Sequence, residues 1–208
     1  MTNTSHGLFI TFEGIDGSGK STQLQRSAKA LREKGITVTE TRNPGGTAIG
    51  KQLREILLHH TGFVSPMAEM MLYMADRAQH MEEVVLPALA RGEVVLCDRH
   101  LDSTVAYQGY GRGLDLSQIH RLNEMATLGR LPDRTFLFDG PPETLALRVN
   151  KRGAADRLER EALTFHHQVR KGFLALAEGN PERFVVLDAL QPLDTLQAQV
   201  MASLQTLR

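Results

Sequence analysis

Short apolar runs recur along the chain, and longer segments with the apolar periodicity of a helix separate them. A strand that is apolar along its whole length is typical of a parallel sheet covered on both faces. The runs therefore predict strands, and the second of them, ITVTET, is predicted from its β-branched residues. These predicted strands are Leu8–Glu13, Ile36–Thr41, Glu93–Asp98, Arg134–Asp139 and Arg183–Asp188.

Helical patterns fill the stretches between these runs. Pro66–Arg91 is predicted to be one long helix, bent near Pro87, and 102–130 to be mostly helical with a glycine-rich break at GYGRG. Strands that alternate with helices indicate a parallel sheet between helical layers. We therefore predict one three-layer α/β/α domain over residues 1–208 with about five parallel strands. The other predicted helices are Lys20–Lys34, Ala48–His59, Glu143–Lys151, Phe165–Glu178 and Leu193–Leu207.

Composition narrows the functional classes. Lys and Arg together number 24, as do Asp and Glu, so a net charge of zero gives no reason to expect nucleic acid or an anionic membrane as partner. The single cysteine, Cys97, excludes an intrachain disulfide framework and lies in an apolar run where a buried core position is expected. The opening MTNTSHG lacks a signal-peptide pattern, and no apolar run approaches the ~18 residues of a membrane helix. We expect a cytoplasmic protein.

A glycine-rich turn follows the first predicted strand and leads into the first predicted helix. It fits G-x-x-x-x-G-K-[ST], the P-loop pattern in which backbone N–H groups and the helix N-terminus hold phosphates. Lys20 is predicted to contact the β- and γ-phosphates, and the Ser21 hydroxyl to bind Mg²⁺. The predicted ATP-binding residues are Gly14, Ile15, Asp16, Gly17, Ser18, Gly19, Lys20, Ser21 and Thr22.

The third predicted strand ends in Asp98-Arg99. At the carboxyl end of a strand beside a P-loop, Asp98 is predicted to hold Mg²⁺ or its waters, and Arg99 to grip a second phosphate. A GTP-binding switch would need N-K-x-D, and the nearest match, residues 150–153, lacks the Asp. The D-x-x-G switch is also missing after this strand, and large motor ATPases are usually longer. A nucleotide kinase fits better.

A basic loop late in the chain, centred on KRGAADR, is interpreted as a short lid over about residues 148–160. Phosphoryl transfer spreads negative charge over equatorial oxygens, and an arginine supplied from the same chain can contribute a factor of ~10³–10⁵. Closure would also exclude water and so favour transfer over hydrolysis. The charged residues of this loop are Arg148, Lys151, Arg152, Asp156, Arg157 and Glu159.

Five blocks in order resemble the thymidylate kinase family: FEGIDGSGKST, TRNPGGT, ADRAQH, DRHLDSTVAYQG, and ADRLERE followed by FHHQVRKGF. They extend over nearly the whole chain, and the block that begins at Asp98 is the most distinctive. Ser18 in the P-loop is not arginine while the lid is arginine-rich, which resembles the bacterial subtype with a catalytic arginine in the lid. The resemblance implies phosphorylation of dTMP to dTDP by ATP with Mg²⁺, and a homodimer.

The resemblance also implies the acceptor site. Arg42 and Arg99 would bind the dTMP phosphate, Tyr73 would stack on thymine, and Arg77 would reach the base edge. Ser103, Tyr107 and Gln108, at i, i+4 and i+5 of one helical segment, would line one side of the pocket. Tyr107 would disfavour a ribose 2′-OH, and Gln108 would hydrogen-bond the pyrimidine. Asp16 would lie near the sugar 3′-OH or the metal.

In the lid, the resemblance favours Arg148 and Arg152 as catalytic arginines, and gives neighbouring charges a positioning role. Asn43 stands where many bacterial relatives have glutamate, which removes a possible salt bridge near Arg42. Met67–Met81 offers a methionine-rich apolar face that fits either a dimer interface or core packing.

We expect direct in-line transfer with no covalent intermediate and no strong general base, because the acceptor phosphate is already a dianion. Two other interpretations stay open at this point. One is a guanylate, cytidylate or deoxynucleoside kinase on the same scaffold. The other is a regulatory module that hydrolyses ATP slowly and transmits a change of shape to a partner.

Overall fold

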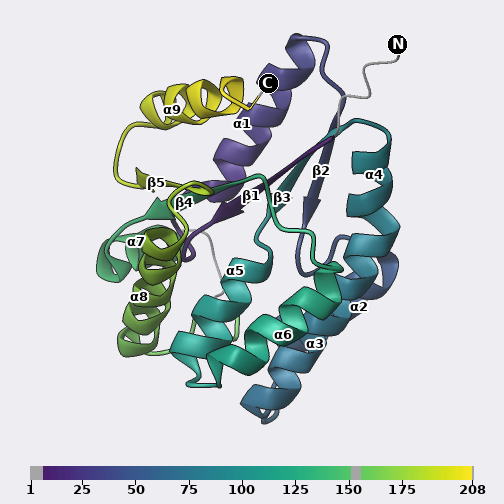
Figure 1. Ribbon diagram of the computed structural model, residues 1–208. Helices are drawn as coiled ribbons and strands as arrows, with labels where there is room; N and C mark the ends of the chain where they lie inside the picture. The colour runs from purple at the N-terminus through teal and green to yellow at the C-terminus, as the bar shows by residue number, and fades with distance from the viewer. Residues whose placement is uncertain (1–6, 151–155, 208) are drawn as a thin grey trace.

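The computed structural model describes residues 7–150 and 156–207, and these form a five-stranded parallel sheet in the order β2-β3-β1-β4-β5 (Figure 1). The prediction of a three-layer α/β/α fold with about five parallel strands is confirmed. β2 starts two residues later than predicted because the N–H of Ile36 bonds to Leu31 O and closes the preceding helix. The strands are β1 (Leu8–Glu13), β2 (Val38–Arg42), β3 (Val94–Asp98), β4 (Arg134–Asp139) and β5 (Phe184–Asp188).

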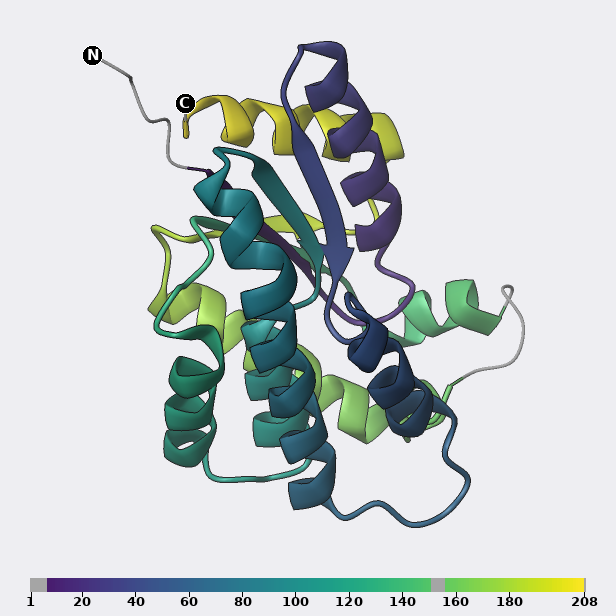
Figure 2. The same cartoon turned by 90° about the vertical axis from the view of Figure 1, so that its right-hand side faces the viewer.

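Helices cover both faces of this sheet. α1 (Lys20–Glu33) and α9 (Leu193–Gln205) lie together on one face (Figure 2), where Leu24 and Leu196 belong to the same core cluster as Ile10 of β1. The other face packs Phe9 against a separate cluster that includes Met81. The other helices are α2 (Ala48–His59), α3 (Pro66–His80), α4 (Leu86–Ala90), α5 (Leu101–Thr104), α6 (Leu116–Thr127), α7 (Pro142–Asn150) and α8 (Leu163–Gly179), with π-helical segments η1 (Met81–Val85) and η2 (Val105–Gly111).

The strand register gathers the predicted functional residues at one end of the sheet. β1 and β3 are adjacent, and Phe12 is level with Asp98. On the other side of β3, Arg42 is also level with Asp98. Because all strands are parallel, the P-loop after β1 and the Asp98-Arg99 segment meet at the carboxyl edge, where open α/β sheets bind ligands.

The predicted long helix is interrupted. α3 and α4 are joined by η1, in which the N–H of Leu86 bonds to Met81 O, one residue further back than in an α-helix. Pro87 then enters in the first turn of α4, where proline is tolerated because no donor is needed. The helical path therefore continues through the proline, with a change of hydrogen-bond pattern before it.

The predicted break at GYGRG is found at the last two residues of that motif, Arg112 and Gly113. The π-helical segment η2 continues to Gly111, and the chain leaves the helix only at Arg112–Asp115. A Cβ on Gly111 would lie 2.6 Å from the ring of Phe165 in α8. A Cβ on Gly172 would lie 2.8 Å from the ring of Tyr110. These glycines therefore permit close packing of η2 against α8.

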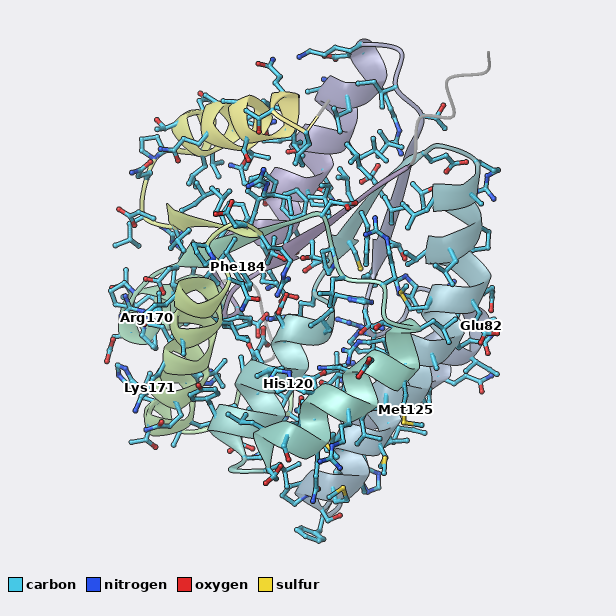
Figure 3. The ribbon with its side chains drawn as sticks, viewed as in Figure 1. Glu82, His120, Met125, Arg170, Lys171 and Phe184 are labelled. Carbon is cyan, nitrogen blue, oxygen red and sulfur yellow. The ribbon has the colours of Figure 1, made fainter. Side chains whose placement is uncertain are left out.

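An ion pair fastens α8 to the sheet. Arg170, labelled in Figure 3, donates two hydrogen bonds of 2.8 Å to the carboxylate of Asp139 at the end of β4. A two-pronged arginine–carboxylate contact fixes orientation as well as distance. The helix that carries the aromatic neighbours of the site is thus held at the carboxyl edge of the sheet.

Candidate active site

The turn after β1 has the backbone of a phosphate-binding loop. Gly14, Gly17 and Gly19 all adopt positive φ, at 136°, 82° and 87°. A side chain is also excluded sterically, because a Cβ on Gly14 would lie 2.5 Å from Phe138 O and one on Gly17 2.4 Å from Leu145 O. α1 begins at Lys20, so its N-terminus faces the loop.

Asp16 joins the two principal cations of the site. Its Oδ1 accepts a hydrogen bond from Lys20 Nζ at 3.2 Å and one from Arg99 Nη2 at 2.8 Å. Burial opposes the charge of Asp16, but the neighbouring charges of Arg99 and Lys20 outweigh burial and hold the pKa of its carboxyl well below the ordinary value. The group is therefore an anion at neutral pH.

Ser21 and Asp98 meet at the entrance of the P-loop helix. Ser21 Oγ donates to Asp98 Oδ2 at 2.5 Å. Asp98 Oδ1 is buried and has no hydrogen-bond partner among the described residues. A hydroxyl beside a carboxylate with a free oxygen is a donor set that suits a hard cation such as Mg²⁺.

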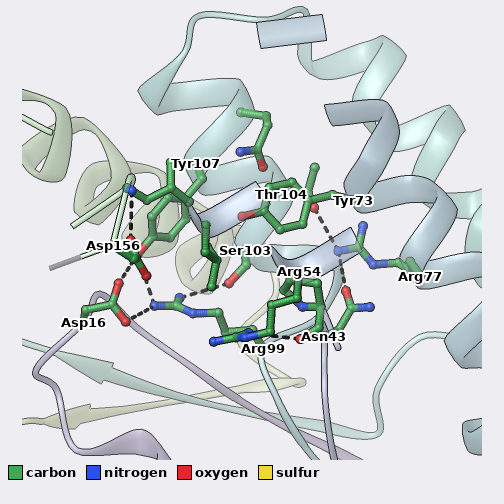
Figure 4. A pocket seen from close by; sticks show the side chains of 14 residues that line it. Asp16, Asn43, Arg54, Tyr73, Arg77, Arg99, Ser103, Thr104, Tyr107 and Asp156 are labelled. Atoms are coloured by element: carbon green, nitrogen blue, oxygen red, sulfur yellow. Dashed lines mark hydrogen bonds and ion pairs between the residues drawn. The ribbon is translucent and has the colours of Figure 1, made fainter. Parts of the chain in front are cut away.

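A pocket of about 500 Å³ opens beside the P-loop (Figure 4). Arg99 lies between Asp16 and Ser103, and Tyr107 stands over the same corner. Except for Arg42, every residue that the sequence predicts for acceptor binding lines this one pocket. Those residues are Asp16, Tyr73, Arg77, Arg99, Ser103, Tyr107 and Gln108.

Arg99 is held in place from several sides. It has a φ of 65° and leaves β3 with its N–H bonded to Phe12 O. Its guanidinium donates to Gly14 O at 2.8 Å, to Ser103 Oγ at 3.2 Å and to Tyr107 Oη at 3.2 Å. Together with the Asp16 contact, these bonds place a fixed positive charge between the P-loop and the pocket.

Glu13, at the end of β1, binds two residues that follow Arg99. Its fully buried carboxylate accepts from the N–H of His100 at 2.7 Å and from Ser103 Oγ at 2.6 Å. Burial, followed by the charge of Asp102, raises the pKa of Glu13 to about 7. His100 and Ser103, which follow Arg99 in the chain, are therefore both bonded to a group whose pKa is near neutrality.

Arg77 is buried in a polar network. It donates to Asn123 Oδ1 at 2.6 Å, Asn43 Oδ1 at 2.9 Å and Thr104 Oγ1 at 2.9 Å. Burial lowers the pKa of Arg77 to about 10, so the guanidinium stays charged at neutral pH. Asn43 also donates to Asp76. The unusual asparagine therefore acts on Arg77 and Asp76, whereas the sequence suggests an effect near Arg42.

Arg42 lies outside the pocket lining. Its side chain is exposed at the end of β2, and no hydrogen bond or ion pair of its guanidinium involves a residue that the structure describes. Arg54 of α2 lines the pocket instead and donates to Pro44 O at 3.0 Å. Arg54 shares a helix face with the buried residues Gly50 and Leu57. A charged residue on an otherwise buried face is the feature of the sequence that could have indicated Arg54 as a site residue.

The lid is described in part. Arg152 and Lys151 lie outside the described residues. Arg148 donates to Ala189 O at 3.0 Å and to Gly17 O at 3.4 Å, which puts one predicted catalytic arginine against the P-loop. Arg157 docks on α2 through a 2.9 Å bond from Nε to Leu57 O. Asp156 and Leu158 line the pocket.

Comparisons with known proteins agree with this arrangement. The sequence model of the family described as Thymidylate kinase matches residues 12–200. The chain is 52% identical over 198 residues to a thymidylate kinase of Exiguobacterium sp., covering 94% of this chain and 92% of the relative. It is 50% identical over 199 residues to one of Deinococcus radiodurans, covering 96% and 97%.

A solved structure extends the comparison to the fold. The crystal structure of thymidylate kinase from Ehrlichia chaffeensis superposes with a TM-score of 0.79 at 35% sequence identity, covering 96% of this chain and 98% of that one. Sequence and structure thus match over almost the full length of both chains. This chain belongs to the thymidylate kinase family.

Proposed function

We propose that this chain transfers the γ-phosphoryl group of ATP to the 5′-phosphate of dTMP, which yields dTDP and ADP and supplies dTTP for DNA synthesis. As a member of its family the chain is an ATP-dependent nucleoside monophosphate kinase. The observation that carries the proposal is the pocket beside the P-loop. There a P-loop residue, Asp16, and the fixed cation Arg99 line the same cavity as the aromatic side chain of Tyr73.

The acceptor phosphate belongs beside Arg99. Its guanidinium lies between the P-loop and the pocket, where it can exchange Asp16 for a phosphate dianion. Arg42, level with Asp98 at the end of the neighbouring strand, and Arg54 on the pocket wall are two further cations near this position. We assign phosphate binding to Arg99 and Arg42, with Arg54 as an additional candidate.

The base belongs at the inner end of the pocket. Tyr73 offers an aromatic face, while Arg77 and Gln108 line the same cavity and offer hydrogen-bonding groups. Tyr107, fixed by its bond from Arg99, is assigned to the sugar, where its ring would disfavour a ribose 2′-OH. Ser103 is assigned to fixing the position of the Arg99 guanidinium, from which its hydroxyl oxygen accepts a hydrogen bond.

Transfer needs positioning and charge neutralisation more than acid–base chemistry. The acceptor is a dianion at neutral pH, so it attacks the γ-phosphorus in line without a strong general base. Lys20 holds the β- and γ-phosphates, and Arg99 holds the acceptor that faces them. The lid arginines Arg148 and Arg152 are assigned to the charge that develops on the transferred group.

The Ser21 hydroxyl and the Asp98 carboxylate fit Mg²⁺, because Asp98 Oδ1 is buried without a partner in the described chain. A bound Mg²⁺ would neutralise phosphate charge during transfer. Ser21 and Asp98 therefore orient one another in the free protein, and they are the residues that would hold the ion.

We also propose that the protein is a cytoplasmic homodimer. Met67 and Met71 on α3 are 42% and 48% exposed, and Met125 on the adjoining α6 is 72% exposed and faces outward (Figure 3). Apolar side chains of this size on two packed helices suit a protein interface. Within the described ranges, no helix has the length and apolar character needed to cross a membrane.

A coupled ADP-release assay tests the proposed reaction. Purified protein with Mg·ATP is given dTMP, dUMP, UMP, CMP, GMP, AMP or thymidine in turn, with a control that lacks an acceptor. Strong preference for dTMP with weaker dUMP turnover is the expected result. ADP release that is independent of the acceptor would leave the phosphate loop intact and refute the assigned second substrate.

A further inference from the structure

Glu69 is a buried carboxylate on which three segments of the chain converge. It lies in the first turn of α3 and has no solvent exposure. Its Oε1 accepts a hydrogen bond from Gln108 Nε2 at 2.8 Å, and Arg112 donates to both carboxylate oxygens at 3.2 Å. Arg157 from the lid turn forms an ion pair with Oε2 at 2.6 Å.

The two guanidiniums keep this carboxylate ionised. Burial favours the neutral acid, but hydrogen bonds from Arg112 and Gln108, together with the charge of Arg112, outweigh it and lower the pKa of Glu69. The positive end of α3 acts in the same direction. An ionised carboxylate has no proton to donate and can only accept hydrogen bonds.

This charge state decides how the amide of Gln108 is turned. Only its nitrogen can bond to an acceptor, so Nε2 must face Glu69 and the carbonyl oxygen must face away from it. Gln108 is almost fully buried and lines the pocket, so it presents an acceptor to whatever base binds there. Thymine offers a donor at ring N3, whereas cytosine offers an acceptor at the same position.

We propose that Glu69 is a positioning residue for base selection, which fixes the Gln108 amide so that the pocket takes a pyrimidine with a ring N–H and rejects cytosine. The inference rests on the proposed function, because it assumes that Gln108 meets the base of the acceptor nucleotide. The new element is Glu69, which makes Gln108 present its oxygen as an acceptor. Glu69 does not itself touch the substrate.

The same carboxylate anchors the lid turn. The backbone N–H of Arg157 donates to Leu58 O at 3.0 Å. Its side chain donates from Nε to Leu57 O and forms an ion pair with Glu69. Asp156, which directly precedes Arg157 in the sequence, lines the pocket. Docking of this turn therefore brings a second positive charge to Glu69 and strengthens the state in which Gln108 presents its oxygen to the base.

Substitution Glu69→Gln separates this role from a general structural one. A glutamine at this position can donate as well as accept, so Gln108 is free to turn either way. We expect the ratio of kcat/KM for dTMP to that for dCMP to fall roughly tenfold or more. Simple loss of packing would slow both substrates alike and leave the ratio unchanged, which would overturn the proposal.

Glu161→Gln is the matched control. Glu161 pairs with the same guanidinium, Arg112, at 2.7 Å and is not a hydrogen-bond partner of Gln108. The chemical change is identical, and the dTMP-over-dCMP ratio is expected to stay within about twofold of the parent value. A drop as large as that of Glu69→Gln would mean that loss of the charge network, rather than amide orientation, controls selection.

A measurement on the unsubstituted enzyme covers the case in which Glu69→Gln does not fold. The side-chain NH₂ protons of Gln108, assigned by their absence from ¹⁵N spectra of Gln108→Met, are expected to be resolved and protected from exchange, and to move little when dTMP binds. Averaged, rapidly exchanging protons would overturn the inference. Absence of any dTMP kinase activity in the parent enzyme would refute the proposed function instead.

Discussion

Substitution Glu13→Gln should change how the stability of the protein depends on pH. Glu13 ends β1 and is fully buried, and its carboxylate accepts from His100 N–H and Ser103 Oγ. Burial, and then the charge of Asp102, raise its pKa from the ordinary 4.5 to about 7. A glutamine can keep both contacts, since its oxygen accepts from His100 and its nitrogen donates to Ser103 Oγ.

The sign follows from proton binding. Between pH 4.5 and about 7 the folded protein holds a proton on Glu13 that the unfolded chain has released. The stabilising contribution of the protonated acid is therefore complete below pH 4.5 and is lost as the pH rises through about 7. Since one pKa unit corresponds to about 1.4 kcal/mol, ionised Glu13 lowers the free energy of unfolding by about 3 kcal/mol above that range.

Urea unfolding followed by circular dichroism, at intervals between about pH 4.5 and 8.5, measures this difference. The free energy of unfolding of Glu13→Gln, relative to the parent, should rise by about 3 kcal/mol across the window and then level off. Glu33→Gln is the control, because that side chain is 66% exposed and its difference from the parent should stay within about 0.5 kcal/mol at every pH. Parallel curves for Glu13→Gln and the parent would refute the reasoning.

Lys20→Ala removes the ammonium group that faces the P-loop, and kcat should fall by about 10² or more; near-normal turnover would contradict the P-loop assignment. Arg152→Ala should lower kcat more than it raises KM for dTMP in steady-state kinetics. An unchanged kcat would shift the catalytic role to Arg148, for which Arg148→Ala is the direct comparison. Tyr107→Phe should relax the preference for deoxyribose over ribose at the acceptor, measured as the ratio of kcat/KM values, and an unaltered ratio would reject its role in sugar recognition.

The strands and the phosphate loop could be predicted because local rules determine them. A short apolar run buried on both faces, as in β1, β3 and β4, admits few alternatives. The glycines of the P-loop are required by positive φ and by contacts such as that of Gly17 with Leu145 O. The helices were predicted less well. Gly111 was expected to lie in a break of the helix, but it lies inside η2. Together with Gly172 it permits contact between η2 and α8, which only the tertiary structure determines.

The acceptor pocket shows the same limit. Resemblance supplied half of its lining residues, but not the partners that set how each side chain acts. Nothing in the sequence around Asn43 indicates that it bonds to both Arg77 and Asp76. A glutamate in a first helical turn, such as Glu69, usually indicates a favourable interaction with the helix dipole, whereas here it is a buried hydrogen-bond acceptor. These contacts link residues more than thirty positions apart, so they depend on how α3 packs against η2 and the loop after β2.

Asp16 explains how the site can be ordered before any nucleotide arrives. It lines both the proposed acceptor pocket and a neighbouring pocket of about 350 Å³ that includes Ile15 and His166. In the proposed reaction it would therefore lie between the acceptor and the phosphates held by the P-loop. An anion between two phosphate-bearing molecules would be unfavourable by itself. Paired with Lys20 and Arg99, however, it holds both cations in position, so their side chains have little conformational freedom left to lose when phosphates bind. This arrangement also lowers the net gain on binding, because each incoming phosphate would have to displace the Asp16 carboxylate from Lys20 or Arg99.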